Sequence, residues 1–180
     1  MVIDSTFPQK EVTAGNMTYL EKLNSKLVSR EKAAEIIADW RKEKCKIVFT
    51  NGCFDLVHKG HIDYLSKAAD MGTQLIIGLN TDASISRIKG PSRPISNESS
   101  RALVMAAFEF VSLVVFFDEP TPYELIKIIQ PDILVKGADY KPEDIVGGDI
   151  VIQSGGQVST IEFLKGYSTS ALVKRIIDNS

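Results

Sequence analysis

The sequence has neither a strong excess of charge of one sign nor a long apolar run. Its 21 lysine and arginine residues nearly balance 23 aspartate and glutamate residues, which gives a formal net charge of −2 at pH 7. Proteins that bind a nucleic-acid backbone usually present a basic surface, so a nucleic-acid partner is not expected. No stretch approaches the roughly 18 apolar residues of a membrane-spanning helix, and the polar N-terminus lacks the apolar part of a signal peptide. We therefore expect no membrane partner and a cytoplasmic location.

Cysteine and histidine are scarce, with two residues of each. Cys45 and Cys53 are expected to be buried free thiols, because disulfides are rare in a reducing compartment. The two histidines, His58 and His61, lie three residues apart in the segment HKGH. A zinc site is one interpretation, but the only nearby third ligands are Cys53 and Asp55, and the spacing differs from that of zinc proteases. We expect no metal site made by protein ligands alone.

Short apolar runs alternate with helical periods along the chain. Strands are predicted over residues 46–50, 74–79, 113–117, 132–136 and 158–163. Helices are predicted over residues 29–44, 58–71, 97–108, 121–129 and 168–177, and polar loops over 80–96 and 137–148. Because strands and helices alternate without a hairpin signal, we expect an α/β fold, a Rossmann-like, doubly wound parallel sheet of about five strands.

The length of 180 residues predicts one domain, which we place at residues 29–180. Residues 1–28 show no sustained period and are interpreted as an N-terminal arm that is loosely ordered or packed on a neighbouring subunit. This arm contains Tyr19, Leu20 and Leu23 without a long helix of its own. We therefore expect a homo-oligomer.

Most of the unusual residues follow directly after predicted strands. They lie in residues 50–61, 80–93, 136–140 and 166–170. Ligands of a doubly wound sheet bind at the carboxyl ends of its strands, so these segments are the candidate site. His58 and His61 begin the helix after the first predicted strand and share one face of it, close to the positive end that binds anions. The alternative is that both are ordinary surface residues.

Several common catalytic fingerprints are missing. No G-x-x-x-x-G-K-[ST] segment is present, and no G-x-G-x-x-G follows the first predicted strand. This argues against P-loop kinases and dinucleotide dehydrogenases. The chain also lacks the G-x-S-x-G nucleophile elbow, which argues against serine hydrolases.

Residues 50–61, TNGCFDLVHKGH, resemble the nucleotidyltransferase superfamily with the H-x-G-H motif. Within it, they are similar to the stand-alone adenylyltransferases that make ADP-heptose from heptose 1-phosphate for the lipopolysaccharide core. The similarity continues through residues 80–84, 89–94, 134–143 and 166–170, with the segments NTDAS, KGPSRP, LVKGADYKPE and GYSTS. Two departures stand out: Ala138 replaces a frequent glycine, and Phe163-Leu164 replaces the Arg-Thr pair of cytidylyltransferases. The second departure favours ATP over CTP.

The resemblance implies roles for individual residues. His58, His61 and Lys59 would be catalytic, acting on the charge that develops at the α-phosphorus and on the leaving pyrophosphate. Asp55, Asn80, Asp82 and Arg101 are further candidates, although Arg101 could equally be a surface charge. Nucleotide or phosphate binding is expected for Thr50, Asn51, Gly52, Phe54, Lys89, Arg93, Lys136, Gly137, Asp139, Ser168, Thr169 and Ser170.

The resemblance also implies the ligands, which are ATP, a sugar 1-phosphate and Mg²⁺ bound mainly through the ATP phosphates. Related alternatives remain open: a cytidylyltransferase for glycerol phosphate or an alditol phosphate, and a pantetheine-phosphate adenylyltransferase. A non-catalytic nucleotide-binding module is the alternative from a different class.

Overall fold

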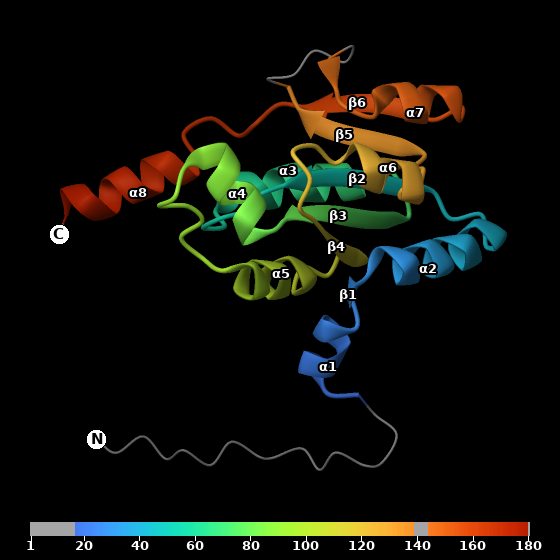
Figure 1. The fold of residues 1–180 in the computed structure, drawn as a ribbon, viewed down its shortest axis with the longest axis horizontal. Coiled ribbons are helices and arrows are strands. Elements are labelled where there is room, and N and C mark those ends of the chain that lie inside the picture. Colours follow the sequence, from blue (N-terminus) through green and yellow to red (C-terminus); the bar gives the residue numbers. More distant parts are fainter. Residues whose placement is uncertain (1–16, 139–143, 180) are drawn as a thin grey trace.

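A single parallel sheet forms the centre of the protein (Figure 1). The structure is a computed structural model, and it describes residues 17–138 and 144–179. The strands are β1 (Leu27–Val28), β2 (Ile47–Gly52), β3 (Gln74–Asn80), β4 (Leu113–Phe117), β5 (Ile133–Gly137) and β6 (Gln157–Ile161). Their order is β1-β4-β3-β2-β5-β6, and every pairing is parallel. The predicted Rossmann-like, doubly wound fold is confirmed, with six strands instead of about five.

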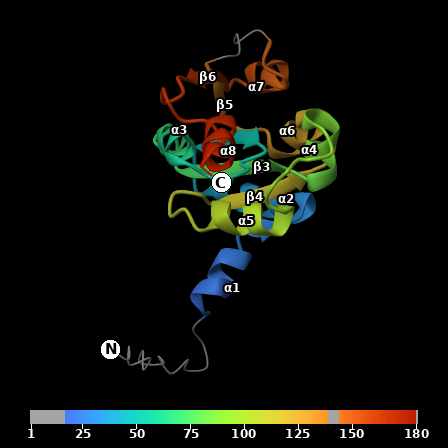
Figure 2. The ribbon, with the colours of Figure 1, turned by 90° about the vertical axis from the view of Figure 1, so that its left-hand side faces the viewer.

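Helices cover both faces of the sheet (Figures 1 and 2). They are α1 (Tyr19–Asn24), α2 (Arg30–Lys42), α3 (Lys59–Ala69), α4 (Asp82–Lys89), α5 (Glu98–Ala106), α6 (Tyr123–Ile129), α7 (Gly148–Gln153) and α8 (Thr169–Asp178). Figure 2 shows α8 in front of the sheet, with α3 on one side of it and α4 on the other. Among the described residues, no helix is long and apolar enough to cross a membrane.

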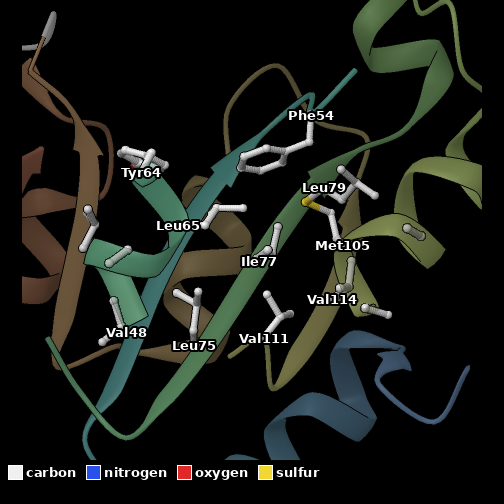
Figure 3. Close-up of a cluster of buried hydrophobic side chains, with 14 of the residues drawn as sticks. Val48, Phe54, Tyr64, Leu65, Leu75, Ile77, Leu79, Met105, Val111 and Val114 are labelled. Atoms are coloured by element: carbon white, nitrogen blue, oxygen red, sulfur yellow. The ribbon is translucent and has the colours of Figure 1, made fainter. Parts of the chain in front are cut away.

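The two faces of the sheet bury two separate apolar clusters. Val48, Leu75 and Ile77 point to the face covered by α3 and α5, where they pack with Leu65 and Met105 (Figure 3). Ile47, Phe49 and Ile76 point to the opposite face and pack with residues of α2, α6 and α7. Because successive residues of a strand point to opposite faces, a sheet covered on both sides needs continuous apolar strands. This need for apolar residues on both faces explains the apolar runs in the sequence.

The described part of the predicted N-terminal arm packs on the domain. β1 pairs with β4 in the register Leu27↔Val114, at the edge of the sheet. The Lys26 ammonium donates hydrogen bonds to the carbonyl oxygens of Ala106 (2.9 Å) and Phe108 (3.1 Å). This corrects the expectation of an irregular arm for residues 17–28. A two-residue strand is too short to produce a periodic signal, which is why the sequence did not reveal it.

Two short helices lie in or next to segments that were predicted to be polar loops. α4 occupies most of the first half of residues 80–96; its N-cap Thr81 accepts a hydrogen bond from the Ser84 N–H, and it ends at Gly90 (φ 95°). α7 begins at Gly148, where the second predicted loop ends. Both helices bury only two residues each, so their sequences carry little of the apolar periodicity that identifies a helix.

Candidate active site

A cavity of about 510 Å³ lies at the carboxyl ends of β2, β3 and β5. Its position agrees with the prediction that the ligand site follows these strands. Ten predicted site residues line it: Asn51, Gly52, Phe54, Asp55, His61, Asn80, Lys89, Lys136, Gly137 and Thr169. Eight further predicted residues that the structure describes are not part of this lining: Thr50, His58, Lys59, Asp82, Arg93, Arg101, Ser168 and Ser170. Asp139 lies outside the described residues.

The two histidines stack on each other at the start of α3. His58 is the N-cap residue of this helix, and the His58 and His61 rings have centroids 3.9 Å apart with an angle of 18° between their planes. The edge of the Phe54 ring approaches His61 at a centroid distance of 5.6 Å. The Nδ1 atoms of both histidines are buried and have no hydrogen-bond partner among the described residues. The two rings therefore stack face to face and nearly parallel, so their ring nitrogens do not point toward one shared metal ion.

Both imidazoles are neutral at pH 7. Burial lowers the pKa of His58, and burial lowers the pKa of His61 to about 4, with further contributions from the neighbouring His58 and Lys89. A neutral imidazole still has one N–H donor, and an anion bound nearby would favour its protonated form. The stacked pair thus provides donors next to the helix N-terminus, which itself favours anions.

Asp55 holds together the segments that surround the histidines. Its buried carboxylate accepts hydrogen bonds from the Arg93 guanidinium (2.9 Å) and from the backbone N–H groups of Ile95 (2.9 Å) and Ser96 (3.0 Å). Its backbone oxygen accepts a bond from the Thr169 hydroxyl (2.9 Å), which ties the start of α8 to the same loop. The flanking residue Phe54 adopts φ 44°, in the left-handed region that residues other than glycine rarely occupy. Asp55 therefore holds these segments of the site together, and both of its carboxylate oxygens already accept hydrogen bonds.

Arg101 is the largest fully buried side chain and lies directly beneath the site. Its guanidinium donates to the backbone oxygens of Cys53 (2.7 Å), Asn80 (2.8 Å) and Ser96 (3.1 Å), and to the Asp82 carboxylate (2.7 Å). These bonds join the ends of β2 and β3 to the segment before α5. The interpretation of Arg101 as a surface charge is wrong. Because Nε, Nη1 and Nη2 all donate hydrogen bonds within the protein, we assign Arg101 the role of positioning these segments.

Two predicted contacts with phosphate take a different form in the structure. Thr50 is fully buried, and its hydroxyl shares a hydrogen bond of 2.8 Å with the Tyr64 hydroxyl, so it supports the cavity wall from behind. The Lys136 ammonium donates to the Asn51 side-chain oxygen across the β2–β5 boundary, and both residues line the cavity. Lys89 also lines the cavity and has an exposed side chain.

The start of α8 adds hydroxyl groups beside the site. Ser168 is the N-cap residue and accepts a hydrogen bond from the Ala171 N–H (3.1 Å), as its capping role requires. Ser170 and Arg93 line a neighbouring groove of about 530 Å³ between α8 and the loop that follows α4. Of the three predicted residues in this segment, Thr169 alone reaches the main cavity lining.

Part of the cavity wall was missed by reasoning from the sequence. The missed residues are Cys53, Tyr64, Ile88, Phe117, Pro120, Thr121, Pro122, Asp144, Ile145 and Val146. Residues 117–122 follow β4, so the rule that directed attention to the other strand ends also applies to this segment. The apolar residues of the wall carry no signal that distinguishes them from core residues.

Comparison with known proteins agrees with this site. Residues 49–175 match the family described as cytidylyltransferase-like, and the chain belongs to this family. The resemblance to the H-x-G-H nucleotidyltransferase superfamily is therefore confirmed.

Curated relatives extend the match. The chain is 52% identical over 149 residues to the bifunctional protein HldE of Azorhizobium caulinodans, covering 83% of this chain and 31% of that protein. It is 56% identical over 153 residues to the bifunctional protein HldE of Campylobacter curvus, covering 85% of this chain and 31% of that protein. The chain thus spans about a third of the length of these relatives.

Solved structures share the fold. The lipopolysaccharide core biosynthesis protein from Thermoplasma volcanium aligns with a TM-score of 0.57 and 24% identity, over 67% of this chain and 99% of that chain. The pantoate-beta-alanine ligase from Francisella tularensis aligns with a TM-score of 0.55 and 14% identity, over 84% and 77% of the two chains. At these identities, both structures support the fold alone.

The Arg101 network predicts a large loss of stability on substitution. Arg101→Met removes the donor to three carbonyl oxygens and the cation paired with the Asp82 carboxylate, so the free energy of unfolding should fall by about 3–5 kcal/mol. The control is Arg87→Met, which breaks the exposed pair of Arg87 with Asp118 and should cost about 0–1 kcal/mol. Urea unfolding of the three proteins measures both changes, and equal losses would contradict the positioning role of Arg101.

The lowered pKa of His61 predicts a dependence of stability on pH. The unfolded chain, with a histidine pKa near 6.5, binds more protons between pH 6.5 and 4 than the folded protein does. Stability should therefore fall as the pH drops through this window, and His61→Gln should remove part of the fall. Because His61 keeps some solvent exposure, the slope of the unfolding free energy against pH should stay below about 1.4 kcal/mol per pH unit, the value for one proton. A difference between the two unfolding free energies that stays constant with pH would contradict the burial of a neutral His61.

Proposed function

We propose that the chain is an adenylyltransferase that transfers AMP from ATP to heptose 1-phosphate, releasing pyrophosphate and forming ADP-heptose for lipopolysaccharide core synthesis. The observation that carries this proposal is the stacked His58–His61 pair at the N-terminus of α3, beside a cavity that Lys89 and Lys136 also line. Membership of the cytidylyltransferase-like family supports nucleotidyl transfer. The similarity to HldE proteins, together with the TNGCFDLVHKGH segment, supports the sugar 1-phosphate acceptor.

The chemistry of this reaction fits the residues of the cavity. A phosphate monoester is largely dianionic at neutral pH, because its second pKa is about 6, and it needs no general base to act as a nucleophile. One of its oxygens forms a bond to the α-phosphorus while the bond from this phosphorus to the β-phosphate oxygen breaks and pyrophosphate leaves. The protein must position two anions and stabilise the charge that builds at the α-phosphorus.

The chain supplies donors and cations in the required place. His61 lines the cavity and His58 stacks on it, and both would donate an N–H to oxygens of the α-phosphate. Lys89 and Lys136 would balance the charge of the triphosphate and the acceptor phosphate. Arg93, which Asp55 already binds through Nη1, would act at the edge of the site. We assign Lys59 to the leaving pyrophosphate.

Nucleotide selection would come from the ends of β5 and β6. Lys136 and Gly137 end β5, and Phe163 follows β6; all three line the cavity and offer an apolar ring and backbone groups for a base. Phe163-Leu164 occupies the place of the Arg-Thr pair that cytidylyltransferases carry, so the polar edge of cytosine would lack partners. We propose that the site selects ATP.

Magnesium would enter with the nucleotide. Within residues 17–138 and 144–179, no three His, Cys, Asp or Glu side chains form a group that could hold a metal ion. The Asp55 oxygens are occupied by Arg93 and two N–H groups, which leaves Asp144 as the described carboxylate on the cavity lining that could approach an ion. This donor set fits an Mg²⁺ ion held mainly by phosphate oxygens, where it would neutralise charge on the triphosphate.

The self-association of the chain is a further part of the proposal. Tyr19 and Leu20 of α1 are 81% and 56% exposed, so α1 presents an apolar surface that a second copy could cover. We also propose a cytoplasmic location, where ATP would be available.

Substrate choice tests the proposed function directly. ATP, CTP, GTP and UTP are each combined with heptose 1-phosphate or glycerol 3-phosphate, and pyrophosphate release is measured. We expect turnover with ATP and heptose 1-phosphate, and a kcat/KM for ATP that exceeds that for CTP by about 10²-fold, because an unpaired polar edge costs a few kcal/mol. A preference for CTP with glycerol 3-phosphate would instead identify a cytidylyltransferase, and binding without turnover a nucleotide-binding module.

Substitution of the histidines should affect catalysis more than binding. His58→Ala and His61→Ala are each expected to lower kcat by about 10² to 10³-fold with a smaller change in ATP affinity, because their donors act mainly in the transition state. Ile62→Ala, an exposed neighbour on α3, is the control and should retain activity. Full turnover by either histidine variant would show that its assigned role is wrong.

Self-association is tested by light scattering at micromolar concentration. Leu20→Asp places a charge on the exposed face of α1 and should shift the protein toward the monomer. Ile152→Asp introduces the same charge on α7, at a residue that is 63% exposed, and serves as the control. A wild-type chain that is already monomeric, or equal shifts for both variants, would rule out assembly through α1.

A further inference from the structure

Tyr167 lies in the segment between β6 and α8, directly before the N-cap of α8. The preceding residue, Gly166, adopts φ 85°, a left-handed conformation that a residue with a side chain would adopt only under strain. This turn brings Tyr167 back toward the N-terminus of α3. The tyrosine is not one of the residues that line the main cavity, and none of the roles described above involves it.

Tyr167 contacts three consecutive residues of the HKGH segment. Its ring lies 6.5 Å from the His58 ring, centroid to centroid, and the Lys59 Nζ lies 5.7 Å from the tyrosine ring centroid. A methyl group at Gly60 would meet the Tyr167 Cβ at 3.0 Å and the His58 ring at 3.0 Å. A side chain at Gly60 would therefore require Tyr167 or His58 to shift, because these two residues lie close beside it.

These contacts restrict two side chains at once. Lys59 is exposed, and the ion pairs of the described residues do not include it. Its contact with the face of the Tyr167 ring is therefore the interaction that restricts the position of its ammonium group. The electron-rich face of an aromatic ring attracts an ammonium at this distance. The Tyr167 ring also lies next to the ring of His58, on which His61 is stacked.

We propose that Tyr167 is a positioning residue, which holds the Lys59 ammonium at the N-terminus of α3 and keeps His58 packed against His61. This inference rests on the proposed nucleotidyl transfer, since it is that reaction which needs a cation and two donors beside one phosphate. Tyr167 needs only its ring for this role, because neither contact uses the hydroxyl group.

Two substitutions separate the ring from the hydroxyl. Y167F keeps the ring and should retain wild-type kcat/KM for ATP, while Y167L removes the aromatic face and should lower it about five-fold. In a Lys59→Met background, Y167L should have little further effect, because the contact is already lost. Y123L is the matched control: it removes the same type of contact, between Tyr123 and Lys127 (4.8 Å), outside the HKGH segment.

The two histidines allow a readout that does not depend on turnover. NMR titration resolves one set of imidazole signals for each, and Y167L should move the titration of His58 toward the ordinary value of 6.5, because it exposes the ring. Y167F and Y123L should leave it unchanged. The thermal midpoint of each variant is recorded, and Y167I replaces Y167L if the latter does not fold.

The outcomes are distinct. Additive losses in the cycle with Lys59→Met, together with an unchanged His58 titration in Y167L, would overturn the role of Tyr167. A wild-type protein without turnover would overturn the proposed function, and the NMR titration would still decide whether Tyr167 covers His58.

Discussion

The buried guanidinium of Arg101 is the constraint on which the geometry of the site depends. The carboxyl ends of parallel strands leave backbone oxygens without partners, and here those of Cys53 and Asn80 accept from Arg101 together with that of Ser96. The Asp82 carboxylate balances the buried charge. If this charge were absent, the loops after β2 and β3 would have to find other donors, and the floor of the cavity would change shape.

The chemistry of the site depends on how this floor supports α3. The loop from Cys53 to Leu56 passes over Arg101 and is bound by Asp55 to the segment after α4, so the start of α3 is fixed from two sides. Stacking and burial then keep His58 and His61 neutral, and the helix N-terminus orients positive potential toward the cavity. A site with fixed donors suits a reaction in which the substrate's own phosphate attacks.

Much of this arrangement could be predicted from the sequence. Strands β2 to β5 follow from nearly continuous apolar runs and β6 from a run rich in β-branched residues. The position of the histidine pair follows from its place after the first of these runs. β1 and α7 are short, and the burial of Arg101 arises only when segments 48 residues apart meet, which no local pattern encodes. Likewise, Thr50 looks like a phosphate ligand in the motif, but the pleat of β2 directs its hydroxyl to Tyr64.

The most direct test of the central claim follows the oxygen that forms the new bond. Heptose 1-phosphate labelled with ¹⁸O at its non-bridging phosphate oxygens is converted with unlabelled ATP, and the products are examined by mass spectrometry and ³¹P NMR. If the sugar phosphate attacks the α-phosphorus, ¹⁸O occupies the bridge between the two phosphorus atoms of ADP-heptose, and the pyrophosphate is unlabelled. Label in the pyrophosphate, or an unlabelled bridge, would contradict the account.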